Sequence, residues 1–293
     1  MKLGKTIENS CVLKILQKAP RTEEGVLRAS RESLNLMIEQ KNQIDFNLNS
    51  IAPSGKVLKF RHDTVKEAIC AEEYIFDFEK DIYVQVADRT LVDLLKNGEI
   101  KNLLYVSPLD AYLSDVKLES CVLMAGSYNP LHHGHIKLLE SAIHATDSSL
   151  LGVFELSISN AAKTEIGDRD LYLRIMQFSK DNKPLLITNK PFFREKVNFI
   201  YPSSWFCIGA DTYKRFFDLK YYESPAQLNE FANFLITNGV KLIVGPRASR
   251  TKLDTVDDYL DLVPDVYKSS VKEVENFRVD ISSTEIRNSK LFV

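Results

Sequence analysis

The chain has 293 residues, of which 44% are hydrophobic, enough for a buried core in one or two domains. Its 38 basic and 40 acidic residues give a net charge of −2, which argues against a protein that binds nucleic acid through a basic excess. The start of the chain lacks a signal-peptide core, and no apolar run is long enough to cross a bilayer. We therefore expect a cytoplasmic protein without a membrane partner, with the nucleus as an open additional location.

The four cysteines lie far apart and form no CxxC pair. This spacing favours neither a disulfide framework nor a zinc knuckle. We expect Cys11, Cys70, Cys121 and Cys207 to be free thiols in a reducing compartment.

Residues 1–115 mix charged helical stretches with strand-like runs and carry no chemical motif. They predict a small α+β region of unknown function. The expected elements are a helix over residues 23–40, a turn at 53–55, a strand over 81–88 and a helix over 90–100 closed by Asn97-Gly98.

Residues 116–293 instead alternate short apolar runs with amphipathic stretches. This alternation predicts an α/β domain with a parallel sheet and helices on both faces, in which ligands bind beyond the carboxyl ends of the strands. The expected strands are 121–126, 150–156, 184–188, 204–210 and 240–245, and the expected helices are 135–145, 168–179 and 225–237.

The segment GSYNPLHHGH, residues 126–135, lies where the first of these strands meets the first helix. Gly126 allows backbone to approach a ligand, and Pro130 stiffens the turn. A helix that begins near Gly134 offers free N–H groups and a positive dipole end, which together favour an anion. His132 and His135 are three residues apart, so both can face the same anion. This pattern is typical of a site that stabilises charge on a phosphoryl group.

Two other interpretations of these histidines remain. They can be structural side chains of the surface or core, although three in one short turn argues against this. The His132-x-x-His135 spacing also suits zinc, but no further Cys/His cluster completes such a site.

The segment VDISSTEIRNSKLF near the end of the chain predicts a strand over Phe277–Ile281 that enters a helix. Ser282 is a natural N-cap, and Glu285 three residues later completes a capping box. One interpretation is a well-capped helix and nothing more. The other adds Ser283, Thr284 and Arg287 as phosphate ligands, so that two helix starts hold both ends of a triphosphate.

Together these residues resemble the nucleotidyltransferase superfamily that carries an (H/T)xGH signature. Residues 126–135 fit its GxFxPxHxGH pattern, with Tyr128 in place of the usual phenylalanine. Residues 281–287 fit its ISSTxIR pattern without a mismatch, and residues 206–216 look like its (V/I)GxD strand end.

The resemblance covers about residues 119–293. Within the superfamily the chain looks most like the nicotinamide/nicotinate mononucleotide adenylyltransferases, especially a eukaryotic branch described as cytidylyltransferase-like. Residues 157–163 and 192–202 are also similar to that branch. The resemblance implies a Rossmann-like domain over residues 116–293, preceded by the smaller α+β region of residues 1–115. It also implies an enzyme that transfers AMP from ATP, with Mg²⁺ arriving on ATP, to a pyridine mononucleotide and releases pyrophosphate.

The family's roles transfer to matching positions of this chain. His132 and His135 would contact the ATP phosphates, Arg287 would hold the outer phosphates, and Asp211 would bind the nucleotide ribose or the second substrate. The expected catalytic residues are His132, His135 and Arg287. The expected nucleotide-binding residues are Gly126, Ser127, Tyr128, Asn129, Lys163, Gly209, Asp211, Arg247, Ser282, Ser283 and Thr284. Lys214 is a further candidate, with an ordinary solvated charge as its alternative.

The chain departs from the family in the acceptor region. Its one tryptophan, Trp205, precedes the GxD segment instead of following it, and residues 160–163 lack an acidic residue that relatives carry. Three hypotheses therefore stay open: an adenylyltransferase of NAD biosynthesis, a cytidylyltransferase or another nucleotidyltransferase with a different phosphorylated acceptor, and a nucleotide sensor without turnover. The expected partners are ATP and a pyridine mononucleotide, and not nucleic acid, with a homo-oligomer as an open alternative.

Overall fold

The computed structural model describes residues 27–29, 50–51, 56–77, 82–106, 111–118, 120–148, 150–159, 165–179, 184–200, 203–248, 253–275, 277–279 and 281–289. The chain forms two compact units, each made of two segments. The first unit comprises Met1–Leu118 and Ser157–Pro191, and the second unit comprises Glu119–Leu156 and Phe192–Val293.

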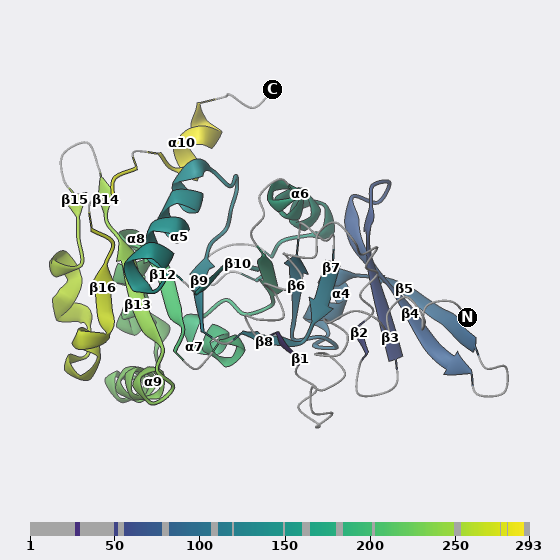
Figure 1. The fold of residues 1–293 in the computed structure, drawn as a ribbon, viewed down its shortest axis with the longest axis horizontal. Coiled ribbons are helices and arrows are strands. Elements are labelled where there is room, and N and C mark those ends of the chain that lie inside the picture. The colour runs from purple at the N-terminus through teal and green to yellow at the C-terminus, as the bar shows by residue number, and fades with distance from the viewer. Residues whose placement is uncertain are drawn as a thin grey trace. The chain divides into compact units, whose positions relative to one another are not determined.

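The second unit is built on parallel strands in the order β16-β13-β12-β9-β10 (Figure 1). Each neighbouring pair of these strands is parallel, so their carboxyl ends lie at one edge of the sheet. The predicted apolar runs that form β9, β10, β12 and β13 are largely buried, as expected for strands covered on both faces, whereas β16 was not predicted. The strands are β9 (Cys121–Ala125), β10 (Leu151–Ser157), β12 (Trp205–Gly209), β13 (Lys241–Gly245) and β16 (Val271–Glu273).

Helices cover both faces of this sheet. On one face, α5 (His133–Thr146) packs so closely on β13 that a Cβ at Gly245 would lie 2.3 Å from Leu138 Cδ1. On the other face, the ring of Phe206 in β12 lies 6.1 Å from the ring of Phe216 in α8 (Ala210–Phe216). Figure 1 shows α5 in front of the strands and α8 behind them. This arrangement confirms the expected Rossmann-like α/β fold.

Shorter elements complete the second unit. Its remaining helices are α7 (Phe193–Lys196), α9 (Pro225–Thr237) and α10 (Ser283–Asn288), with 3₁₀ turns η2 (Val197–Phe199), η3 (Leu219–Tyr221), η4 (Asp257–Leu262) and η5 (Asp265–Ser270). Two short strands, β14 (Arg247–Ala248) and β15 (Leu253–Asp254), pair antiparallel.

The strand expected at Phe277–Ile281 is wrong for residues 277–279 and 281, none of which is in a strand. The alternating residues of this segment resemble a strand, but β16 occupies the place beside β13.

The first unit contains an antiparallel sheet in the order β2-β3-β4-β5. Its last strand leads directly into α4 (Leu91–Lys96), where the Thr90 hydroxyl caps the helix by accepting from the N–H of Asp93 at 3.2 Å. The left-handed Gly98, with φ of 69°, follows the helix end, so the expected strand, helix and Asn97-Gly98 stop are confirmed. The strands are β2 (Ser50–Ile51), β3 (Lys56–Asp63), β4 (Ala68–Asp77) and β5 (Ile82–Thr90).

Two elements of this unit differ from the expected ones, as their strand pairing shows. Leu27–Ala29, inside the expected helix over residues 23–40, form β1 and pair parallel with β8 (Val116–Leu118), and the rest of that helix lies outside the described residues. The strand expected at residues 184–188 is β11 (Leu185–Thr188), but it pairs antiparallel with β6 (Asn102–Val106). The unit also holds β7 (Ala111–Ser114) and α6 (Asp168–Phe178).

The domain boundary expected at residue 115 stays a prediction. The first of the two segments of the first unit ends at Leu118. The second segment is Ser157–Pro191, and its strand β11 pairs with β6 of the first segment. A truncation that starts at Lys117 would remove β6 and leave β11 without this partner. Solubility of that truncation tests the boundary directly.

Candidate active site

The loop that follows β9 is folded back on its own strand. The N–H of Gly126 donates to the carbonyl of Glu155 on β10 at 3.0 Å, which continues the pairing one residue past the strand. Tyr128 is left-handed, with φ of 46°, and its buried ring lies under Gly126. A Cβ at Gly126 would lie 2.6 Å from that ring, so only glycine fits here. The Tyr128 hydroxyl donates to the carbonyl of Met124, which closes the loop.

The aromatic ring of Tyr128 also connects the loop to the helix that follows. It lies 5.3 Å from the ring of Phe154 on β10 and 5.2 Å from the ring of His135 on α5, edge to face in both cases. The peptide bond between Asn129 and Pro130 is cis. Tyr128, predicted as a nucleotide-binding residue, therefore acts within this structure as the buried support of the loop.

His132 and His135 meet at the first turn of α5. His132 is the N-cap residue, and its backbone N–H donates to Nδ1 of His135 at 3.3 Å. The two rings stack, with centroids 3.8 Å apart. Because Nδ1 of His135 accepts, its neutral ring carries the proton on Nε2 and presents that atom as a donor. Stacked rings do not aim their nitrogens at one point, which argues against zinc held by this pair.

Both histidines of the pair are held neutral. Burial, and to a smaller extent the neighbouring His132, lowers the pKa of His135 to about 3. Burial also lowers the pKa of His132, with His133 as the smaller cause. The pair therefore offers uncharged hydrogen-bond donors at neutral pH, beside the backbone N–H groups of the helix start.

Gly134, between the two histidines, permits close packing of a distant segment. A Cβ at this position would lie 2.9 Å from Val279 Cγ1 and 3.0 Å from His132 Nδ1. The glycine of the HxGH motif thus admits the segment that leads into α10.

Side chains of α10 bond directly to the loop after β9. Ser283 Oγ donates to the carbonyl of Pro130 at 2.9 Å, and Arg287 donates to the carbonyl of Asn129. Arg287 also donates to Thr284 Oγ1 at 3.0 Å. These contacts bring the two motifs together, as the sequence analysis expected.

The start of α10 has the expected cap. The N–H of Glu285 donates to Ser282 Oγ at 3.2 Å, and that hydroxyl donates to Glu285 Oε2 at 2.9 Å. Ser282 is therefore committed to the helix end, whereas Thr284 and Arg287 are exposed.

Gly209 and Asp211 lie at the same edge of the sheet as Gly126. Cys207 of β12 pairs with Met124 of β9, so Gly209 and Gly126 each follow this pair by two residues. The chain leaves β9 into α5 and β12 into α8, on opposite faces. A crevice between such strand ends is where open α/β sheets bind ligands. Asp211 is exposed in the first turn of α8, with Gly209 as the N-cap.

The structure gives less support for a site role of the three basic candidates, Lys163, Arg247 and Lys214. Lys163 lies outside the described residues, and Arg247 is described only through its backbone in β14. Lys214 is exposed, and its ammonium lies 5.4 Å from the ring centre of Tyr259. This cation–π contact favours the structural interpretation of Lys214.

A buried ion pair that sequence analysis missed lies next to the loop. Lys196 Nζ of α7 is 2.5 Å from Glu155 Oε2 of β10, with side chains 7% and 0% exposed. The signal was present as a charged residue inside the apolar run LLGVFEL, residues 150–156.

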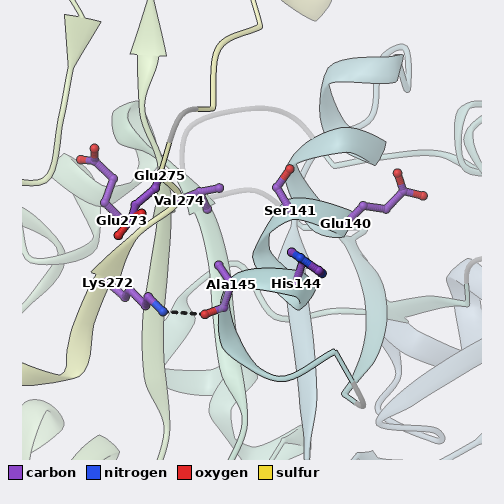
Figure 2. A pocket seen from close by; sticks show the side chains of 8 residues that line it. All are labelled: Glu140, Ser141, His144, Ala145, Lys272, Glu273, Val274 and Glu275. Carbon is purple, nitrogen blue, oxygen red and sulfur yellow. Dashed lines mark hydrogen bonds between the residues drawn. The ribbon is translucent and has the colours of Figure 1, made fainter.

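An open depression of about 650 Å³ lies elsewhere in the second unit, between the later turns of α5 and the β16 region (Figure 2). There Lys272 Nζ donates to the carbonyl of Ala145 at 2.5 Å. None of the predicted site residues lines it, so we do not take it as the active site. Its lining residues are Glu140, Ser141, His144, Ala145, Lys272, Glu273, Val274 and Glu275.

Within the described ranges, no three His, Cys, Asp or Glu side chains group as a metal site. In the same part of the chain, no helix is long and apolar enough to cross a membrane.

Comparisons with known proteins agree with this geometry. Residues 123–289 match the model of the cytidylyltransferase-like family, so the chain belongs to that family of nucleotidyltransferases. The chain is also similar to a protein from Fusobacterium nucleatum subsp. nucleatum described as a probable nicotinate-nucleotide adenylyltransferase. The two are 25% identical over 171 residues, which cover 57% of this chain and 84% of the bacterial protein. The expectation of a nucleotidyltransferase enzyme is confirmed.

Proposed function

We propose that this nucleotidyltransferase transfers AMP from ATP to nicotinamide or nicotinate mononucleotide and releases pyrophosphate. The observation that carries the proposal is the bonding of Ser283 and Arg287 to the Asn129–Pro130 turn. It joins the two motifs that are proposed to bind phosphate, at the strand edge where α/β folds bind nucleotides. The bacterial relative, described as a probable nicotinate-nucleotide adenylyltransferase, supports a pyridine mononucleotide as the acceptor.

The proposed reaction is an in-line substitution at the α-phosphorus of ATP. A phosphate oxygen of the mononucleotide forms a bond to this phosphorus, and the bond from the phosphorus to the bridging oxygen of pyrophosphate breaks. The mononucleotide phosphate is already an anionic nucleophile at neutral pH, so no covalent enzyme intermediate or strong base is required. Catalysis then depends on positioning two anions and stabilising the charge that moves onto pyrophosphate.

His135 is proposed to stabilise that charge. Its Nδ1 is occupied by the N–H of His132, so Nε2 is left to donate to a phosphate oxygen. Because the ring is neutral, the donor loses no proton during the reaction and attracts the phosphate through its dipole. Arg287, which donates to the carbonyl of Asn129 in the same loop, is proposed to supply a positive charge.

Other predicted residues are proposed to bind substrate. Backbone of Gly126 and Ser127 would line the phosphates, and Thr284 would contact the outer ones. Asp211, exposed at the neighbouring strand end, would bind a ribose or the second substrate.

Mg²⁺ is proposed to enter with ATP. Mg²⁺ in such sites keeps several waters and binds substrate phosphates with one or two protein carboxylates. The predicted site contains one carboxylate, Asp211, and it is exposed, so its donor set fits an ion carried by the nucleotide. When bound, the ion neutralises phosphate charge and orients the leaving group.

Pyrophosphate release by the purified chain with Mg²⁺ tests this proposal. ATP and CTP are each paired with nicotinamide mononucleotide, nicotinate mononucleotide and phosphopantetheine, and product masses are checked. We expect turnover with ATP and a pyridine mononucleotide. Turnover with CTP instead of ATP would make CTP the nucleotide substrate. Turnover with phosphopantetheine would make phosphopantetheine the acceptor in place of a pyridine mononucleotide. Binding of ATP without turnover in any pair would favour a nucleotide sensor.

A further inference from the structure

The ion pair between Glu155 and Lys196 is unusual among those of the described residues, because both of its side chains are almost fully buried. In the next most enclosed ion pair, between Arg89 and Glu73, the arginine side chain is 30% exposed. Desolvating two charges is costly, and apolar pairs of the same volume often stabilise a fold equally well. Stability alone is therefore a poor explanation of this pair.

The pair lies directly behind the loop after β9. Glu155 is paired with Ala125, the last residue of β9, and its carbonyl receives the N–H of Gly126. The preceding residue, Phe154, supports the ring of Tyr128. Successive side chains of a strand point to opposite faces, so Phe154 supports the loop on the α5 face. The Glu155 side chain then extends from the other face, where α7 supplies Lys196.

The charges of this pair also suit a nearby anion site. An unpaired carboxylate behind Gly126 would repel the phosphates that the loop is proposed to hold. With Lys196 at 2.5 Å the carboxylate is neutralised, and the carboxyl end of β10 is tied to α7. The carbonyl that receives the Gly126 N–H is thereby fixed in place.

We propose that Glu155 and Lys196 are positioning residues, which fix the carboxyl end of β10 so that the Gly126 loop and the histidine pair meet the phosphates correctly. They touch no substrate and act through the loop. This inference rests on the proposed function only in that the loop binds phosphate. A misplacement of about 1 Å lowers turnover by about 10²-fold in such sites.

The test variant is the double substitution Glu155→Leu/Lys196→Met, which replaces both charges by apolar groups of similar size. Its matched control is Lys272→Met, which removes a lysine that bonds to the far end of α5, outside the site. Lys196→Arg is the conservative variant that keeps the charge. The readouts are the Kd for inorganic pyrophosphate by calorimetry, kcat, the KM for ATP and for the pyridine mononucleotide, and the thermal midpoint.

In the double variant we expect pyrophosphate affinity to fall at least tenfold and kcat to fall about 10²-fold. The KM for the pyridine mononucleotide and the thermal midpoint should change little. Lys196→Arg should keep at least a third of the wild-type kcat, and Lys272→Met should match the wild type in every readout. If the double variant does not fold by circular dichroism, Glu155→Gln takes its place with the same thresholds.

A folded variant whose pyrophosphate affinity falls less than tenfold overturns the inference, because the pair would then serve stability alone. If the wild type binds pyrophosphate but turns over no substrate pair, the proposed function fails and the affinity ratio still decides the role of the pair. A wild type that binds no pyrophosphate overturns the inference, whereas the proposed function is still decided by the turnover assay.

Discussion

Ser283 Oγ donates to the carbonyl of Pro130 across 153 residues of sequence, and this bond attaches α10 to the loop after β9. Ser283→Ala removes the bond and should lower the free energy of unfolding by about 1 kcal/mol. The KM for ATP should rise as α10 loosens. Ser289→Ala is the matched control, since Ser289 Oγ at the other end of the helix donates to the carbonyl of Ile286 in α10. Urea unfolding and ATP kinetics on both variants check this, and equal behaviour would contradict it.

His135→Ala should lower turnover by roughly 10²–10³-fold, the usual loss for one donor to a transition state. ATP binding and folding should change less. His144→Ala on the same helix serves as the control, because His144 is exposed near the other end of α5. Normal turnover of His135→Ala would exclude His135 as a catalytic residue.

The pH dependence of kcat should show no titration of this histidine between pH 6 and 8. The pKa of His135 is lowered to about 3, so its ring stays neutral across that range and its donor is unchanged. A rise in kcat toward pH 6 in the wild type that is absent from His135→Gln would show that the charged ring is the active form instead. Steady-state rates at saturating substrates decide between these outcomes.

The free energy of unfolding should decrease in acid because of the same histidine, His135. The folded pKa of His135 lies below its usual value of 6.5, so the unfolded chain binds more protons between pH 6.5 and about 3. The contribution of this group is thus fully present above pH 6.5 and is lost as pH falls through this window, with a slope of up to about 1.4 kcal/mol per pH unit. Urea unfolding of the wild type and His135→Ala at pH 7, 6 and 5 measures the difference. Identical slopes would show that His135 protonates freely in the folded protein.

Gly134→Ala should disturb the junction of α5 with the segment before α10. The helix itself gains about 1 kcal/mol from alanine, but overpacking against Val279 costs typically 1–3 kcal/mol. We expect a small net loss of stability and a larger loss of turnover. The double variant Gly134→Ala/Val279→Ala relieves the contact at Val279 and should recover part of the activity. No recovery would place the effect at His132, whose Nδ1 is equally close.

Much of the candidate site was predictable because the local structure of each motif is determined by residues that are neighbours in the sequence. A strand that ends in Gly126, a stiff turn and a capped helix start are set by neighbouring residues, and so is the Ser282–Glu285 cap. The parallel sheet followed from the alternation of apolar and amphipathic segments. These features need no knowledge of distant partners.

What could not be predicted depends on residues far apart in the chain. The antiparallel pairing of β11 is set by β6, about eighty residues earlier, and periodicity carries no information about partners. The Glu155–Lys196 pair likewise joins residues 41 positions apart. The strand expected at Phe277–Ile281 fails because alternation alone does not show that β16 already holds the place beside β13.

The contact between Arg287 and Asn129 spans 158 residues, and this separation affects the order in which the site forms during synthesis. At roughly 5–20 residues per second, the ribosome adds Arg287 on the order of ten to thirty seconds after Asn129. Through that interval a nascent chain contains the histidine pair without α10. Chains released before Ser283 would therefore hold half of the proposed phosphate site, and premature termination even close to residue 282 should yield inactive protein.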